Sequence, residues 1–441
     1  MKQTLLSIAA ACLALTATAQ KPAYDMTIDG VKVIVQPSGN DIVEVQTVIK
    51  GGVMNYPADK AGIESLAMNA LTECGTLKHD KNSFKDILDK VSGEVYGYAS
   101  KDYSTVRMNC VKSDFDVVWP LYVEALTQPK FDEKEFARIK DNALSRLKSM
   151  ESQPDFAVNK LADKTAFAGR NYAKDPSGTT ASLTPLTVQE TKTYYQSLLT
   201  RSRLLIVVVA DLDKSVIEQK VKAMLDGVKA GAPFALKKES FRAYKNTFAS
   251  EPRAIATNYL VGTTSGPLPG TPDFNAFNVA MRIFYDRHFL EVRTNNGLSY
   301  APGAYFSNGA TSVARFTVST TEPDKYIAVF DKLVDQVKGK GFTEDEVKNM
   351  KISYLTGFYY KQETNSAQAS SLASNEVLHN NWKRSLTLAD DVKGLTLNDV
   401  NNAFRKYIGG ITWVYLGDTK KVNPVLYTNG TLKKGDNPVS H

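Results

Sequence analysis

The sequence predicts an α+β protein made of two homologous domains, each a mostly antiparallel sheet with helices packed on it. Strand-like segments alternate with amphipathic helical segments, and strand-like segments return after the helices. Three segments of the first half also recur in the second half. The 441 residues are 43% hydrophobic and 23% charged, the ordinary mix of a globular protein long enough to form large cores.

The recurring segments indicate a duplicated domain of about 210 residues. Residues 131–140 resemble residues 342–351, residues 186–190 resemble residues 395–399, and the apolar run 204–209 corresponds to 413–416. Chance similarity between amphipathic helices could explain one match. It hardly explains three matches in the same order.

The first elements of the mature chain are two strand-like segments. Residues 31–35 and 42–49 are rich in β-branched residues, and the Pro-Ser-Gly-Asn segment at 37–40 is typical of a turn. Together they predict a β-hairpin.

A helix is expected after these strands, because Ile63, Leu66 and Leu71 recur at helical spacing. In the second half Phe277 and Phe284 lie on one face of a corresponding helix. Each half therefore begins its helical part with an amphipathic segment.

A linker is expected between the halves. Residues 227–253 carry glycines, prolines and basic residues with weak periodicity. The two domains are then predicted at residues 20–226 and 254–441.

The N-terminus has the pattern of a secretory signal peptide. Lys2 precedes a mainly apolar stretch at 5–17, and an A-x-A cleavage site ends at Ala19. A lipoprotein signal ending at Cys12 is the alternative, although the residues before it form a poor lipobox. We expect residues 1–19 to be removed and the protein to be exported to the periplasm or cell envelope. No later run of 18 apolar residues predicts a membrane span.

Charge and histidine content exclude two classes of function. The net charge of +7 comes from 54 basic and 47 acidic residues without a run of five like charges, so nucleic acid binding is not expected. The four histidines are too far apart in the sequence for paired ligands on one helix, so no metal site is predicted. They are His79, His288, His379 and His441.

Two cysteines, Cys74 and Cys110, remain after removal of the signal peptide. An oxidising compartment would allow them to pair. They could equally be two buried small hydrophobic residues. Their spacing does not decide between these alternatives.

Several short motifs resemble the pitrilysin/insulinase family of zinc peptidases. They are Gly51-Gly52, the helix start at 61–63, the Glu-Cys-Gly-Thr segment at 73–76 and the segment 93–105. The resemblance covers nearly all of the mature chain and includes the duplication. The smaller two-domain members, similar to mitochondrial processing peptidase subunits, fit the length best. The resemblance implies a clam-like pair of domains.

The family's zinc motif is H-x-x-E-H, whose side chains share one helix face so that two His bind zinc and the Glu serves as base. Here the motif falls on Ser65, Met68 and Asn69. An alignment from the Gly-Thr pair at 75–76 moves it to Leu66, Asn69 and Ala70. The region of the third ligand, residues 142–150, contains no acidic residue. The resemblance therefore implies a homologue without the zinc motif and without a catalytic residue at these positions.

A second family feature is retained in the C-terminal half. The family carries an Arg and a Tyr seven positions apart that reach substrate at the zinc site of the facing half, and Arg293 and Tyr300 match them. A helix is expected to end near 295–297 and a strand to cover 298–306. The resemblance implies that Arg293 binds a peptide group and Tyr300 an oxyanion. The alternative is a surface Arg near a helix end and a Tyr packed on the sheet.

Two further substrate contacts are implied on the edge strand of the first half. Tyr96 and Gly97 stand where the family usually has Asn-Ala. Sheet edges accept extended peptides, so pairing with a peptide is possible there in altered form.

Three hypotheses follow from the resemblance. The first is a non-catalytic subunit that offers Arg293 and Tyr300 to a peptide substrate held by a paralogous, zinc-binding partner chain in a heterodimer. This chain would then hold no cofactor, and zinc would lie in the partner. The second is an inactive peptide-binding or scaffold protein, with a homodimer as one form. The third is a peptidase with an unusual metal site.

We predict that the protein purified alone contains no stoichiometric zinc, because no His or Cys cluster has ligand spacing. Elemental analysis of the metal content measures this directly. One tightly bound zinc per chain would contradict the non-catalytic hypothesis.

Overall fold

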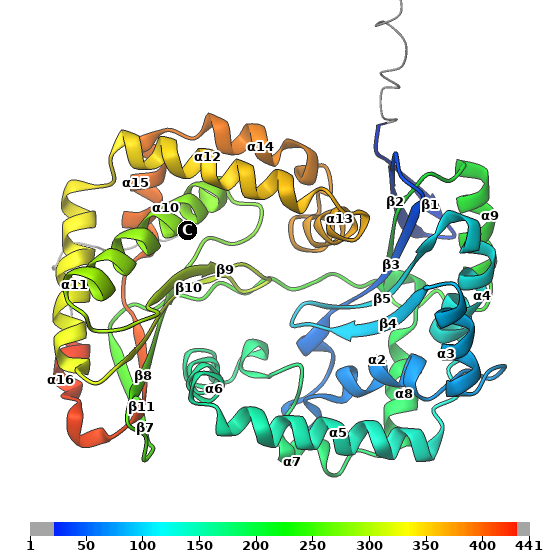
Figure 1. The fold of residues 1–441 in the computed structure, drawn as a ribbon, viewed down its shortest axis with the longest axis horizontal. Helices are drawn as coiled ribbons and strands as arrows, with labels where there is room; N and C mark the ends of the chain where they lie inside the picture. The colour runs from blue at the N-terminus through cyan, green and yellow to red at the C-terminus, as the bar shows by residue number, and fades with distance from the viewer. Residues whose placement is uncertain (1–21, 430–441) are drawn as a thin grey trace, which may run out of the picture.

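The computed structural model describes residues 22–429, which form two halves, each with its own sheet (Figure 1). The predicted signal peptide lies outside the described residues. The strands are β1 Tyr24–Ile28, β2 Val31–Pro37, β3 Ile42–Lys50, β4 Glu94–Ala99, β5 Tyr103–Val111, β6 Leu204–Ala210, β7 Thr247–Pro252, β8 Asn258–Ser265, β9 Gly303–Ser307, β10 Val313–Thr320 and β11 Thr412–Gly417.

Helices pack on both sheets (Figure 1). Those of the first half are α2 Ile63–Glu73, α3 Lys81–Lys90, α4 Phe115–Thr127, α5 Glu133–Ser152, α6 Pro154–Ala166, α7 Thr180–Leu183, α8 Val188–Leu198 and α9 Lys214–Leu225. Those of the second half are α10 Asp273–Phe289, α11 Pro323–Lys340, α12 Glu344–Lys361, α13 Asn365–His379, α14 Arg384–Gly394, α15 Leu397–Tyr407 and α16 Pro424–Thr428.

The two sheets have the same topology apart from one strand. The first has the order β1-β2-β6-β3-β5-β4 and the second β7-β11-β8-β10-β9. In each, a central strand (β6 or β11) lies parallel to one neighbour and antiparallel to the other. The predicted equivalence of these two strands, and the α+β class with two similar domains, are confirmed. β1 has no counterpart in the second sheet.

The predicted hairpin of residues 31–35 and 42–49 is wrong. Both segments are strands, β2 and β3, but β6 lies between them. All seven residues of β6 are buried, so this strand needs a partner on each edge. The observed hairpin joins β1 to β2 through Asp29 and Gly30, whose φ angles of 47° and 83° form a tight turn.

The sequence repeats coincide with helix starts. α8 and α15 both begin with a capping box, formed by Thr187 and Glu190 in one and Thr396 and Asp399 in the other. In each box the hydroxyl and the carboxylate satisfy backbone N–H groups at the helix start. The matching pattern at 186–190 and 395–399 therefore has a local physical cause.

One helix of each half packs on the sheet of the other half. α6 of the first half packs on β8 and β11, where Val158 and Ala162 meet Val261, Val414 and Leu416. α13 of the second half packs on β3 and β6 of the first sheet (Figure 1). Both helices lie opposite the face that packs on α2 or α10, so each sheet becomes buried on two sides.

Small residues let α13 approach the first sheet closely. Ala369 and Ala373 are fully buried there, and the Ser370 hydroxyl accepts a hydrogen bond from the Gln46 amide at 3.3 Å. The Asn365 side-chain amide donates to the Ile42 carbonyl at 2.6 Å. The Ser/Ala-rich segment 366–374 is therefore a packing surface.

A second polar contact joins the halves on the α6 side. Asp102, in the turn between β4 and β5, accepts hydrogen bonds from the Tyr172 hydroxyl at 2.5 Å and the Ala310 amide at 3.2 Å. Arg315 on β10 forms an ion pair with Asp163 on α6. These bonds connect side chains of the first half to the second sheet and its β9–β10 loop.

The predicted linker at 227–253 extends too far. Its last residues form β7, which pairs with β11 from Thr247 to Pro252. β7 is an exposed edge strand with polar residues and a terminal proline, so its sequence lacks strand periodicity. Within the remaining segment, Phe241 is buried against Phe167 of the first half.

Cys74 and Cys110 are free and buried. Burial raises the pKa of both thiols to about 12, so neither is a reactive thiolate at neutral pH. They occupy core positions as small hydrophobic side chains.

We predict that Asn365→Ala lowers the free energy of unfolding by about 1–3 kcal/mol, because it leaves the half-buried Ile42 carbonyl and the buried Val209 carbonyl without this donor. Asn349→Ala, also on a helix but exposed, is the matched control and should change stability by less than about 0.5 kcal/mol. Urea unfolding measures both. Equal effects would show that Asn365 does not help to hold the halves together.

Candidate functional site

The predicted zinc-motif positions lie on α2 and offer no metal ligand set. The Ser65 hydroxyl donates to the Pro176 carbonyl at 2.6 Å, and the Met68 side chain is fully buried. Asn69 is exposed and donates to the Ser65 carbonyl at 2.8 Å. In the alternative alignment Leu66 and Ala70 are buried apolar residues. Across residues 22–429, no three His, Cys, Asp or Glu side chains gather as a metal site.

A buried carboxylate at the start of α2 fixes this helix in place. The side chain of Glu64 is 1% exposed and accepts hydrogen bonds from the Asn55 amide at 3.1 Å and from the Ser104 and Tyr194 hydroxyls. Burial raises the pKa of Glu64, while these hydrogen bonds and the nearby Arg203 guanidinium oppose the shift. The network ties α2 to β5 and α8.

Glu64 was not predicted from the sequence. It shares one helix face with Ala67, Met68 and Leu71, all of which are buried. A lone acidic residue on an apolar helix face is the signal that could have identified it, because such a group needs several donors when buried.

The edge strand of the first sheet lies directly against α2. β4 is the last strand in the sheet order. A Cβ atom at Gly97 would lie 2.4 Å from the Met68 carbonyl oxygen, so this close approach requires glycine. Tyr96 and Tyr98 project from the opposite face of the strand and are 41% and 60% exposed.

Arg293 and Tyr300 are brought together by a turn at the end of α10. The helix continues into a π-helical segment, Leu290–Asn295, and Gly297 then adopts a φ of 62°. The Gly297 amide donates to the Arg293 carbonyl at 3.1 Å. The helix end predicted at 295–297 is confirmed, with glycine in the left-handed conformation that reverses the chain.

The Arg293 guanidinium lies over two aromatic rings. Its central carbon lies 4.0 Å from the Tyr300 ring centroid and 5.1 Å from that of Phe289. Within the described part of the chain the Arg293 side chain has no hydrogen bond or ion pair. The Tyr300 side chain is 79% exposed. The N–H groups of Arg293 and the hydroxyl of Tyr300 are therefore available to a ligand.

The strand predicted at 298–306 is shorter than expected. β9 starts at Gly303, so Tyr300 lies in the preceding loop rather than at the strand start. Pro302 has no N–H group and cannot extend the ladder with β10. This loop leaves the Tyr300 ring free to turn onto Arg293.

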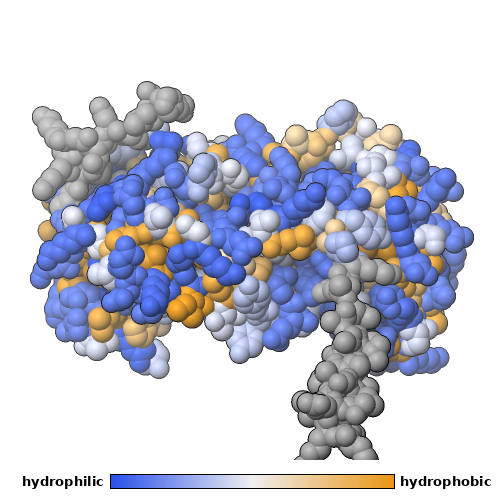
Figure 2. All heavy atoms as spheres, turned by 90° about the horizontal axis from the view of Figure 1, so that it is seen from above, coloured by the Kyte–Doolittle hydropathy of each residue, from blue (hydrophilic) through white to orange (hydrophobic). Residues whose placement is uncertain are grey.

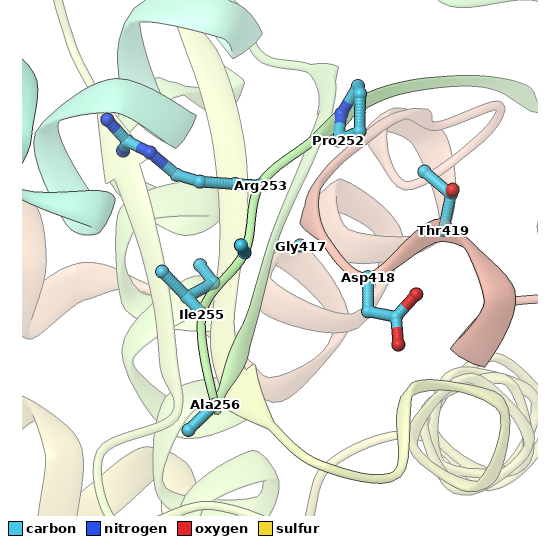
Figure 3. Close-up of a pocket in the computed structure, with 8 residues that line it drawn as sticks. Pro252, Arg253, Ile255, Ala256, Gly417, Asp418 and Thr419 are labelled. Carbon is cyan, nitrogen blue, oxygen red and sulfur yellow. The ribbon is translucent and has the colours of Figure 1, made fainter.

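A cavity of about 600 Å³ lies away from these residues, at the ends of β7 and β11. Arg253 extends away from Asp418 there (Figure 3), and its guanidinium donates to the Glu151 carbonyl at 2.7 Å. Asp418 is the one carboxylate among the lining residues, so we assign the space no chemistry. The lining residues are Pro252, Arg253, Ala254, Ile255, Ala256, Gly417, Asp418 and Thr419.

The face seen in Figure 2 is mainly hydrophilic, with hydrophobic areas between the hydrophilic residues. Among residues 22–429 no helix is both long and apolar enough to cross a bilayer.

Two family models match consecutive parts of the chain. Residues 32–180 match the insulinase domain of peptidase family M16, and residues 185–354 match the peptidase M16 inactive domain. An uncharacterised zinc protease of Streptomyces coelicolor is 22% identical over 291 residues. This alignment spans 62% of this chain and 62% of the relative, less than two thirds of its length.

Solved structures share the fold across both halves. A peptidase M16 inactive domain protein from Pseudomonas fluorescens has a TM-score of 0.81 at 16% identity, covering 91% of this chain and 99% of its own. A protease from Helicobacter pylori has a TM-score of 0.79 at 16% identity, with 90% and 99% covered. The periplasmic protease PqqL from Escherichia coli has a TM-score of 0.78 at 14% identity, with 92% and 48% covered.

These matches agree with the fold of two similar halves. The chain therefore belongs to the M16 (insulinase) peptidase family, as a homologue that lacks the H-x-x-E-H zinc motif.

Proposed function

We propose that this protein is the non-catalytic, Arg/Tyr-bearing subunit of a heterodimeric zinc metallopeptidase that degrades or processes peptides in the cell envelope. The observation that carries the proposal is an asymmetry between the halves. The zinc-motif positions Ser65, Met68 and Asn69 hold no ligand set. In contrast, the half-buried Arg293 lies over the ring of the exposed Tyr300 and has no side-chain hydrogen bond or ion pair among the described residues.

The pair suits the chemistry of peptide hydrolysis. Attack of a zinc-bound water on a peptide carbonyl places negative charge on its oxygen, and the Tyr300 hydroxyl can donate a hydrogen bond to that oxyanion. The Arg293 guanidinium can donate to a neighbouring peptide carbonyl or carboxylate. Stacking on Phe289 and Tyr300 holds the guanidinium plane before substrate binds, which reduces the conformational entropy lost on binding.

The zinc and the water-activating Glu would come from the partner, a paralogous chain with an intact H-x-x-E-H motif. Export of both chains would bring them together in the periplasm or cell envelope. The N-terminal signal pattern supports this location, as does the structural similarity to PqqL, a periplasmic protease. Without such a partner, the same surfaces would serve only peptide binding.

Peptide substrate would also pair with β4. Its outer edge carries no neighbouring strand in the sheet order, so its N–H and C=O groups can accept an extended segment. Gly97 keeps that edge close to α2, and Tyr96 offers a ring to alternate side chains of the peptide.

We predict that Arg293→Ala and Tyr300→Phe reduce peptide hydrolysis by the reconstituted pair while folding and association stay intact. Loss of one oxyanion donor costs on the order of 10²–10³ in rate, so Tyr300→Phe should lower mainly kcat. Arg293→Ala should raise mainly KM. Steady-state hydrolysis with both chains present measures these constants.

Size exclusion checks that each variant still assembles. Tyr360→Phe, an exposed tyrosine on α12, is the matched control and should keep wild-type kinetics. Unaltered kinetics in both Arg293→Ala and Tyr300→Phe would mean that the pair has only a structural role and would contradict the proposed function.

A further inference from the structure

A row of four side chains, the α10 stripe, extends along one face of α10 from the Arg/Tyr pair. Its members are Arg282, Tyr285, Phe289 and Arg293. Their spacings of three and four residues place them on one face of a helix. The zinc-motif positions lie on α2 in the first half, so they are not part of this face of α10.

Aromatic rings orient both guanidiniums of the stripe. The Arg282 guanidinium carbon lies 4.8 Å from the ring centroid of Tyr354 on α12. Tyr285 and Phe289 are in contact, with ring centroids 6.0 Å apart, and Phe289 stacks on Arg293. Stacking fixes a guanidinium plane while leaving its N–H edge free for hydrogen bonds.

Neither guanidinium has an ion-pair partner within the described residues. Arg282 donates only from Nε, to the Asn278 side chain at 3.2 Å, and Asp286, one turn further along, forms no ion pair with it. The neighbouring Glu291 is engaged by the amides of Asn295 and Asn296. Both guanidiniums therefore lie on this helix face without an ion pair, and Asp286 is the carboxylate at helical spacing between them.

Other arginines of the second half are engaged by polar groups. Arg287 pairs with Glu346, Arg315 with Asp163, Arg384 with Asn275 and Arg405 with the Lys338 carbonyl. Arg287 and Arg315 are thus neutralised by carboxylates, whereas Arg384 and Arg405, like Arg282, hydrogen-bond only neutral groups.

The length of the stripe sets the size of its ligand. A rise of 1.5 Å per residue separates Arg282 and Arg293 by roughly 16 Å. An extended peptide advances about 3.3 Å per residue, so about five of its residues span this distance. Free guanidinium N–H groups at both ends favour carboxylates.

We propose that Arg282 is a specificity-determining residue that binds an acidic side chain of the peptide about five residues away from the group held by Arg293 and Tyr300. The ligand class is an extended acidic peptide. This inference rests on the proposed function for its biological setting, but the binding itself needs only this chain.

The test uses the purified full chain and two fluorescein-labelled peptides of twelve residues, equal except for two glutamates or two glutamines placed five residues apart. Fluorescence anisotropy at low salt measures Kd. We expect the glutamate probe to bind about 10-fold more tightly, a difference of about 1.4 kcal/mol. Arg282→Gln should abolish this preference, and Arg282→Lys should restore part of it.

Arg242→Gln is the matched control, since it removes the same charge from an exposed position in the segment between the halves. It should keep the preference for glutamate. Equal binding of the two probes by the wild-type chain, a preference that survives Arg282→Gln, or an equal loss in Arg242→Gln would each overturn the proposal.

The results that would refute the proposed function differ from those that would refute the role of Arg282. Normal hydrolysis by Arg293→Ala and Tyr300→Phe in the reconstituted pair would refute the subunit role while leaving the glutamate preference intact. A wild-type chain without a glutamate preference, together with impaired hydrolysis by Arg293→Ala and Tyr300→Phe, would refute only the role of Arg282.

Discussion

Burial of each sheet's second face by a helix from the opposite half is the contact on which the rest of the structure depends. α6 covers β8 and β11, and α13 covers β3 and β6. A half folded alone would expose the apolar positions of that face, such as Val261 and Leu416 in the second sheet. The hydrophobic effect therefore favours the closed pair over two separate domains.

Close packing across this boundary determines which residues occur there. Alanines on α13 allow the helix to approach the first sheet, and Asn365 satisfies backbone carbonyls that the approach removes from water. Polar bonds to Asp102 and Asp163 set the relative position of the halves on the α6 side. The edges β4 and β9 occupy equivalent places in the two sheets because the halves share one topology.

The two halves share one topology but differ in the polar side chains at the start of α2 and at the end of α10. At the start of α2, Glu64 is buried and saturated with hydrogen bonds, so this end of the first half is a structural network. At the end of α10, a π-helical turn and Gly297 bring the half-buried Arg293 beside the exposed Tyr300, and neither side chain has a polar partner among residues 22–429. The first arrangement stabilises the fold, and the second presents free donors to a ligand. The Arg282 side chain extends that ligand surface along α10.

The sequence alone determined the duplication, the helix starts and the absence of an H-x-x-E-H motif, because each depends on residue type and local spacing. The capping boxes at Thr187 and Thr396 are examples, since their hydrogen bonds lie within one helical turn. Only the tertiary structure decided that β6 enters between β2 and β3, and that Asn55, Ser104 and Tyr194 meet Glu64. These features depend on contacts between distant segments, whose free energies no local pattern encodes.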